Sequence, residues 1–175
     1  MKEGAKRITV IQGEYEISSD PEMVLTTVLG SCIAVCAYDP LAGIGGMNHF
    51  LLPEKGEQDG GRRNTIFGSY LMELLLNELY KNGARRERLQ IKLFGGACML
   101  NSCFDTGERN AEFILRFLAD EKLPVMASSL GGLRGRRIEF FPVSGRSRQK
   151  FMAETKEDFV PPPATVTRPG EVELF

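Results

Sequence analysis

The sequence predicts a single α/β (α+β) domain with mixed β-sheets and two main helices packed on the outside. Its 175 residues are close to the usual size of one domain and suffice to bury a core. Short apolar runs of strand length recur between turns that contain Gly or Pro. Two longer stretches repeat their apolar residues at helical spacing. These three observations favour one mixed domain.

Strands dominate the first third of the chain. They are expected at residues 8–12 (continued by 13–17), 23–29, 33–38 and 44–52. Residues 18–21 are typical of a turn. Residues 39–43 form a second turn, because Pro40 presets φ and Gly43 tolerates a positive φ. The strands on either side of this second turn therefore form a hairpin, which Pro53 ends.

The middle of the chain alternates helix and strand. A charged, Gly-rich loop at residues 54–63 is either the rim of a site or a plain connection. Asn64 is expected to cap a helix that ends at Gly83. Its apolar stripe reads as core and consists of Ile66, Phe67, Tyr70, Leu71, Leu74, Leu75 and Leu79. A strand at 89–94, a helix from about 108 to 122 and a strand at 125–130 predict a β-α-β unit.

The hairpin brings two reactive side chains together. If Tyr38 pairs with Gly43 across a four-residue loop, the same register puts Cys32 opposite His49, the chain's one histidine. Directly opposed residues have Cβ atoms roughly 4.5–5.5 Å apart, so a contact between thiol and imidazole is expected. A bulge at Gly45-Gly46 would shift this register by one residue.

A cysteine beside a histidine can act as a nucleophile, because a neighbouring imidazolium lowers the pKa of the thiol. The alternative is that Cys32 is a small buried hydrophobic residue and His49 a structural one. Their shared register and the glycines around them favour catalysis. Ser31 is a rival nucleophile, but on a strand its side chain would point away from His49.

Charge, hydropathy and cysteine spacing exclude several other classes. With 22 basic and 23 acidic residues the net charge is −1, which gives no general attraction to nucleic acid. No apolar run approaches ~20 residues and no signal peptide opens the chain, so we expect a cytoplasmic protein without membrane insertion and with reduced cysteines.

Cys32 and Cys36, about 13 Å apart on one strand, cannot share a zinc ion. Cys98 and Cys103 are expected to be packing or loop thiols. No nucleotide-binding glycine motif is present.

Several motifs closely resemble the CheD family of bacterial chemoreceptor glutamine deamidases. The most specific are Leu29-Gly30-Ser31-Cys32, Asp39-Pro40 and Gly45-Gly46-Met47-Asn48-His49-Phe50 with Leu52-Pro53. The resemblance continues at Gly95-Gly96-Ala97, Gly107-Glu108-Arg109-Asn110, Leu130-Gly131-Gly132 and Gly135-Arg136-Arg137, and spans roughly residues 8 to 150. It implies a fold shared with CheD and the deamidating cytotoxic necrotizing factor toxins, in a domain of residues 1–155. Residues 156–175 are expected to form a flexible tail.

The resemblance also implies a reaction. Cys32 would attack a receptor glutamine with His49 as base, and no cofactor would be needed. The glutamate produced could then be methylated in the adaptation system. A family threonine six residues before the cysteine corresponds to Thr26, whereas the residues alone do not distinguish Thr26 from Thr27. The remaining predicted site residues, which would shape the site or bind the oxyanion, are Ser31, Gly30, Gly46 and Asn48.

The expected partners are the cytoplasmic helices of chemoreceptors. A second function is a regulatory module that binds a CheC-type chemotaxis phosphatase, and a third is a thiol hydrolase acting on another protein or a small amide. The intact pair of Cys32 and His49 favours catalysis. The Arg-rich residues 134–150 are either a protected edge strand or a surface for an anionic partner. Here the chain departs from the family, because Ser129 stands where an acidic residue is common.

Overall fold

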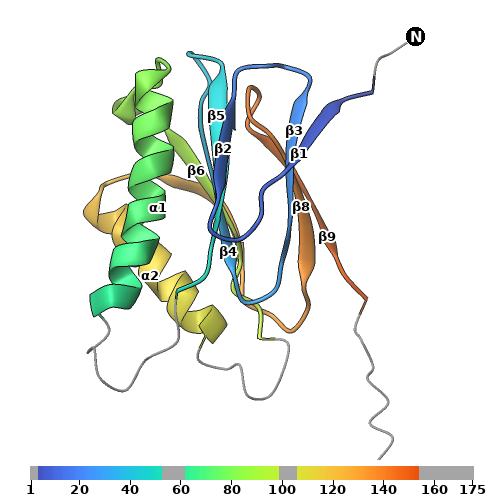
Figure 1. Ribbon diagram of the computed structural model, residues 1–175, viewed down its shortest axis with the longest axis vertical. Helices are drawn as coiled ribbons and strands as arrows, with labels where there is room; N and C mark the ends of the chain where they lie inside the picture. The colour runs from blue at the N-terminus through green and yellow to red at the C-terminus, as the bar shows by residue number, and fades with distance from the viewer. Residues whose placement is uncertain (1–3, 53–61, 99–105, 154–175) are drawn as a thin grey trace, which may run out of the picture.

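The computed structural model describes residues 4–52, 62–98 and 106–153, and its elements form three layers (Figure 1). A five-stranded sheet in the order β2-β5-β4-β6-β7 lies in the middle. Two helices cover one of its faces, and a four-stranded sheet in the order β1-β3-β8-β9 covers the other. The strands are β1 (Lys6–Thr9), β2 (Tyr15–Ser18), β3 (Met23–Leu29), β4 (Ile33–Asp39), β5 (Ile44–Phe50), β6 (Gln90–Gly95), β7 (Val125–Leu130), β8 (Arg136–Phe141) and β9 (Arg146–Phe151). The helices are α1 (Arg62–Lys81), α2 (Thr106–Asp120) and the short 3₁₀ helix η1 (Arg86–Arg88).

These layers confirm the predicted fold class of mixed sheets with helices on the outside. β1 pairs with β3 and β6 with β7 in parallel, and the other pairs are antiparallel. The predicted β-α-β unit is confirmed, since α2 connects the parallel strands β6 and β7. No helix in the described ranges is long and apolar enough to cross a membrane.

Two hydrophobic cores lie on opposite faces of the five-stranded sheet. Ile33, Val35 and Ala37 of β4 pack in the core beneath the helices. Ala34 and Cys36, which alternate with them, pack in the core between the two sheets. All seven residues of β4 and of β5 are buried. The direction of each side chain therefore decides which layer it meets.

The N-terminal strands and helix starts differ from the prediction. Residues 8–17 form no continuous strand: β1 joins the four-stranded sheet and β2 the five-stranded one, with a turn through Gly13 at φ +87° between them. Helix α1 begins at Arg62, so Asn64 lies in its first turn and is not its cap. Residues 54–61 of the predicted loop, Cys103 and the predicted tail lie outside the described residues.

The hairpin register is shifted by two residues from the predicted one. Asp39 pairs with Ile44, so the four-residue loop covers residues 40–43 and begins one residue later than expected. The Asp39 carboxylate accepts hydrogen bonds from the backbone N–H groups of Leu41 and Ala42 and forms an ion pair with Arg88. Although burial opposes ionisation, these contacts lower the pKa of Asp39 to about 2. The charged carboxylate thus fixes the start of the loop.

Residues 131–135 do not form a hairpin loop, although their glycines are typical of one. β7 belongs to the five-stranded sheet and β8 to the four-stranded one, so this segment crosses between the sheets. Gly131 and Gly132 have φ of +80° and +81°, a conformation that glycine adopts without strain. β9 is an edge strand, as one interpretation of the Arg-rich stretch expected. Arg136, however, is buried and is not part of a solvated surface.

Candidate active site

The predicted nucleophile lies in the connection from β3 to β4, at the lower end of the molecule as drawn in Figure 1. Three successive backbone carbonyls hold this turn, which we call the nucleophile turn (Gly30, Ser31 and Cys32). Gly30 O accepts a hydrogen bond from Ala97 N and Cys32 O accepts one from Gly96 N, each at 2.9 Å. Ser31 O accepts one from Asn110 Nδ2 at 2.8 Å. Gly30 and Ser31 thus help to place Cys32 through their backbone.

Gly95 lets the end of β6 approach this turn closely. Its φ is +117°, and a Cβ atom built on it would lie 2.0 Å from Cys32 O. Any side chain here would force the two segments apart. Gly95 therefore permits close packing of β6 against the turn.

His49 lies on β5, and its ring reaches across to the four-stranded sheet. Nδ1 lies 2.9 Å from Thr27 Oγ1 and 3.3 Å from Val10 O. The Thr27 hydroxyl donates its proton to Val10 O at 2.7 Å. Its oxygen is therefore left to accept a hydrogen bond from Nδ1–H, and this network assigns the proton of the neutral ring to Nδ1. Nε2 then carries the free lone pair.

That nitrogen is available as a base. His49 Nε2 is buried and has no hydrogen-bond partner within the described part of the chain. Burial lowers the pKa of His49, so the ring is neutral at neutral pH. A neutral imidazole with a fixed tautomer and an unpaired Nε2 is suited to accept a proton.

Cys32 lies on the same face of the five-stranded sheet as His49, but not directly opposite. His49 pairs with Ala34, so Cys32 lies two residues before the partner of His49, just ahead of the first residue of β4 and on the diagonal. Cys32 packs against the core between the sheets, towards which the His49 ring also points. Its Sγ lies 3.7 Å from Gln12 Oε1. The expected direct opposition is therefore wrong, because the loop starts at Pro40, while the two-residue shift preserves the shared face.

The electrostatics of Cys32 also differ from the expectation. Burial raises the pKa of its thiol, while its own backbone N–H acts in the opposite direction and lowers that pKa. The resting pair is thus a neutral thiol and a neutral imidazole, not a thiolate and an imidazolium. The backbone N–H of Cys32 is thus the one backbone donor, among the described residues, that favours the charged form of this thiol.

Thr27, not Thr26, contacts the histidine. Neighbouring residues of a strand point to opposite faces, so only one of the two can reach His49. The Thr26 hydroxyl instead donates to Ile138 O on β8, at 2.9 Å. The hydrogen bond to the histidine ring is therefore made by Thr27 and not by Thr26, the residue at the family position.

Gly46 and Asn48 face the helices and not the reactive pair. A Cβ atom on Gly46 would lie 2.8 Å from Leu75 Cδ1 of α1. Asn48 Nδ2 donates to Met72 Sδ, and Asn48 Oδ1 accepts from Val35 N at 3.2 Å. The structure does not bring these two residues to the side of the sheet that carries Cys32 and His49. Their contacts instead join β5 to its neighbours in the helical layer.

Sequence reasoning missed two further residues near the nucleophile. Asn110 is fully buried in α2 and joins two segments, since Nδ2 donates to Ser31 O and Oδ1 accepts from Leu52 N at 3.1 Å. An asparagine on the apolar side of a helix was the signal that could have identified it. Gln12, the nearest polar contact of the thiol, follows Ile11 in an exposed connection and gave no such signal.

Comparison with known proteins gives consistent results. The family model described as CheD chemotactic sensory transduction matches residues 51–151. A relative from Agrobacterium fabrum, named probable chemoreceptor glutamine deamidase CheD, is 52% identical and covers 100% of this chain and 99% of its own. Relatives with the same name from Caulobacter vibrioides and Acidiphilium cryptum are each 49% identical, with 99% and 98% of this chain covered and 95% and 94% of their own. These full-length matches include Cys32 and His49, which the family model does not reach.

Solved structures are more distant. The hypothetical protein YfiH of Bacillus licheniformis superposes with a TM-score of 0.45 at 16% identity, over 67% of this chain and 51% of that one. A protein of Neisseria meningitidis assigned to DUF152 gives the same TM-score at 10% identity, over 83% of this chain and 73% of that one.

Proposed function

This chain belongs to the CheD family, and from that premise we propose that it converts glutamine side chains of chemoreceptors to glutamate by cysteine catalysis. The observation that carries the proposal is His49, whose Nδ1 is held by Thr27 and whose buried Nε2 has no partner among the described residues. Cys32 lies on the same face of the sheet, at the diagonal position. A thiol and a free imidazole nitrogen in this arrangement form a nucleophile and its base.

The first half-reaction forms a thioester. Nε2 of His49 takes the thiol proton as Sγ of Cys32 attacks the carbon of the glutamine amide, and the carbonyl oxygen becomes an oxyanion. The backbone N–H of Cys32, which lowers the pKa of the thiol, is the proposed donor to that oxyanion. The imidazolium then gives its proton to the amide nitrogen, the carbon–nitrogen bond breaks and ammonia leaves.

The second half-reaction consumes water. Nε2 takes a proton from a water molecule, whose oxygen attacks the thioester carbon. The carbon–sulfur bond breaks, the sulfur takes up the proton, and glutamate leaves. The sum is one amide and one water converted to one carboxylic acid and one ammonia, so this mechanism requires no cofactor.

Thr27 takes the orienting role in this mechanism. Its oxygen accepts the proton of Nδ1, because its own hydroxyl proton goes to Val10 O, and a rotated ring would lose the contacts of Nδ1 with Thr27 and Val10. In the proposed mechanism this leaves Nε2 free to act on the thiol and stabilises the imidazolium when it forms.

The proposed substrates are the cytoplasmic helices of chemoreceptors, which places the reaction in the cytoplasm. Each deamidation replaces a neutral amide by a carboxylate, which can then be methylated during sensory adaptation. Deamidation thus sets the charge of the receptor. Docking of a CheC-type phosphatase is a second proposed activity and is compatible with catalysis.

Mass spectrometry of a receptor cytoplasmic fragment incubated with the protein tests the proposal. Wild type should convert specific glutamines to glutamate. Cys32→Ala should abolish this conversion, and His49→Gln should slow it by roughly 10²–10⁴-fold, because a positioned base contributes about that much.

Cys36→Ala is the matched control, since Cys36 is buried between the sheets on β4, four residues after Cys32, and should leave turnover per folded molecule unchanged. Deamidation that persists in Cys32→Ala would refute cysteine catalysis. A wild type that binds a CheC-type phosphatase tightly but deamidates no receptor would favour the binding module.

A further inference from the structure

Arg136, the first residue of β8, is a buried cation. It is 1% exposed, and its partners among the described residues are neutral. Nη1 donates to the carbonyl and to the hydroxyl of Ser129, and Nη2 donates to the carbonyl of Gly131. The ring of Phe151 lies 5.0 Å from the guanidinium carbon. Nε is buried and has no partner in the described part of the chain.

A neutral side chain would fill this volume without the cost of desolvating a charge. Burial disfavours the charged form and lowers the pKa of Arg136. What the guanidinium adds is geometry, since its planar fork reaches two carbonyls that lie two residues apart. The guanidinium thus fixes the backbone from Ser129 to Gly131.

That segment supports the glycine-containing segment after β6. Gly131 N donates to Gly95 O at 2.9 Å, and Gly132 O accepts from Cys98 N at 2.8 Å. These two hydrogen bonds flank Gly96 and Ala97. The position of residues 95–98 thus depends on the segment that Arg136 binds.

Residues 95–98 in turn hold the nucleophile turn. Gly96 N and Ala97 N donate to Cys32 O and Gly30 O, as described above. The backbone of Arg136 also contacts the other end of this turn, because it pairs with Leu29, the residue directly before Gly30. A continuous series of hydrogen bonds therefore runs from the guanidinium to both sides of Cys32.

We propose that Arg136 is a positioning residue. Through this series of hydrogen bonds it sets the place of the Cys32 thiol relative to His49. The proposal rests on the proposed function for its kinetic effect. Arg136 is not given any contact with substrate, and it acts on the reaction only through residues 129–132 and 95–98.

Arg136→Lys tests the proposal. Lysine keeps the charge, but its single ammonium cannot bridge the two carbonyls as a fork does. We expect kcat to fall by roughly 10- to 100-fold, the effect of a misplacement of about 1 Å, with KM within about twofold of wild type. The second-order rate of Cys32 alkylation by iodoacetamide should change together with kcat. The matched control is Arg137→Lys, at the neighbouring exposed position, which should change neither quantity.

The alkylation measurement separates this proposal from the proposed function. If the wild type deamidates no receptor fragment, the deamidase assignment fails, and the alkylation rates of Arg136→Lys and wild type still decide the role of Arg136. A variant with a lowered melting temperature but wild-type kcat per folded molecule and wild-type Cys32 alkylation would show a purely structural role and overturn the proposal.

Ser129→Ala serves if Arg136→Lys does not fold. It removes only the hydroxyl contact, 3.0 Å from Nη1, and leaves the two carbonyl contacts. We expect a two- to fivefold loss of kcat with an altered alkylation rate, consistent with one hydrogen bond. Wild-type values for both would overturn the proposal.

Discussion

The two faces of strand β5 carry different kinds of polar side chain. His49 faces the four-stranded sheet, where Thr27 fixes one ring nitrogen and the other is left unpaired among the described residues. Asn48, the neighbouring residue, faces the helices. Its side-chain amide forms hydrogen bonds with β4 and α1. One face keeps a polar atom available, while the other uses its polar atoms for packing.

The burial of a side chain also depends on its position along the interface between the two sheets. Cys32 and Cys36 lie on the same side of β4, yet Cys36 is fully buried and Cys32 lies half-buried at the end of the strand. The centre of this interface is closed to a substrate, whereas Cys32 keeps part of its surface exposed. The proposed chemistry would therefore be confined to one end of one face, and the following experiments test that confinement.

The largest expected contrast is between the two thiols. Iodoacetamide should alkylate Cys32 at least about 100-fold faster than Cys36, because alkylation of Cys36 requires the sheets to separate. The thiolate is the reacting form and burial raises the pKa of Cys32, so its rate should still increase as the pH approaches and passes the ordinary thiol value of 9.0. Peptide mass spectrometry over time measures both rates. Equal rates in the native protein would contradict this difference in exposure.

The next contrast is between neighbouring threonines. Thr27→Val should lower kcat/KM by roughly five- to tenfold, because it removes one hydrogen bond of about 1 kcal/mol from the base, whereas Thr26→Val should have little effect. His49 acts in its neutral form, so activity should fall as the pH drops through its pKa, which burial places below the ordinary 6.5. Steady-state kinetics from pH 5 to 8 measure both effects. A larger loss in Thr26→Val would return the role to Thr26.

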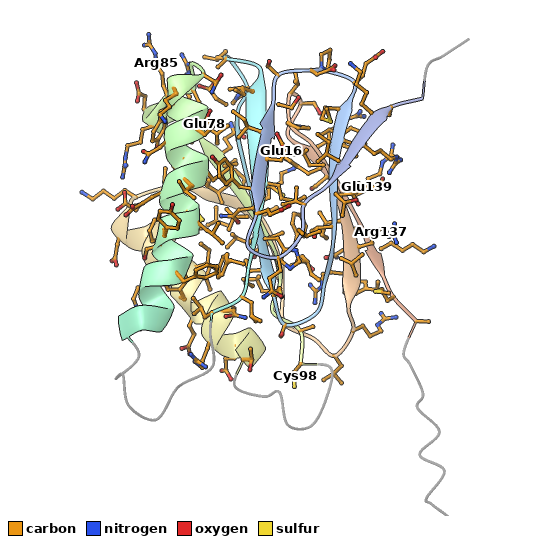
Figure 2. All side chains as sticks on the ribbon, in the orientation of Figure 1. Glu16, Glu78, Arg85, Cys98, Arg137 and Glu139 are labelled. Carbon is orange, nitrogen blue, oxygen red and sulfur yellow. The ribbon has the colours of Figure 1, made fainter. Side chains whose placement is uncertain are left out.

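The smallest effect is expected on the outer face of the four-stranded sheet, which lies away from both described helices (Figure 2). The exposed Arg137 and Arg148 lie there beside Glu139. If this face guides an acidic receptor, Arg137→Glu should lower kcat/KM a few-fold at low ionic strength and less at high ionic strength, since salt screens exposed charges. Kinetics at two salt concentrations measure the difference. Identical ratios at both would exclude a steering role.

The sequence predicted which residues form the candidate site better than it predicted how they are arranged. Cys32 and His49 were identified from the hairpin and the motifs around them, and the structure places both on one face of the sheet. The register was missed because it depends on the Asp39 carboxylate, which keeps this residue in the strand and moves the loop. Side-chain hydrogen bonds of this kind leave no periodic signal.

The direction of the other site residues was not predictable for a different reason. β4 and β5 are buried on both faces, so apolar residues appear at every position and alternation does not show which face meets the helices. Gly46 and Asn48 were therefore assigned to the site although they face α1. Arg136 was similarly read as surface, because a basic run does not show which of its members points inward.

The strand order β1-β3-β8-β9 has a consequence for synthesis of the protein. The three residues assigned to catalysis lie within the first 49 of the chain, but the sheet that seats Thr27 gains β8 only after residue 136 has been made. During translation, all the reactive groups therefore leave the ribosome long before the layer that aligns them. A nascent or prematurely ended chain would contain Cys32, His49 and Thr27 without the complete sheet that orders Thr27, so we expect activity only from the nearly finished domain.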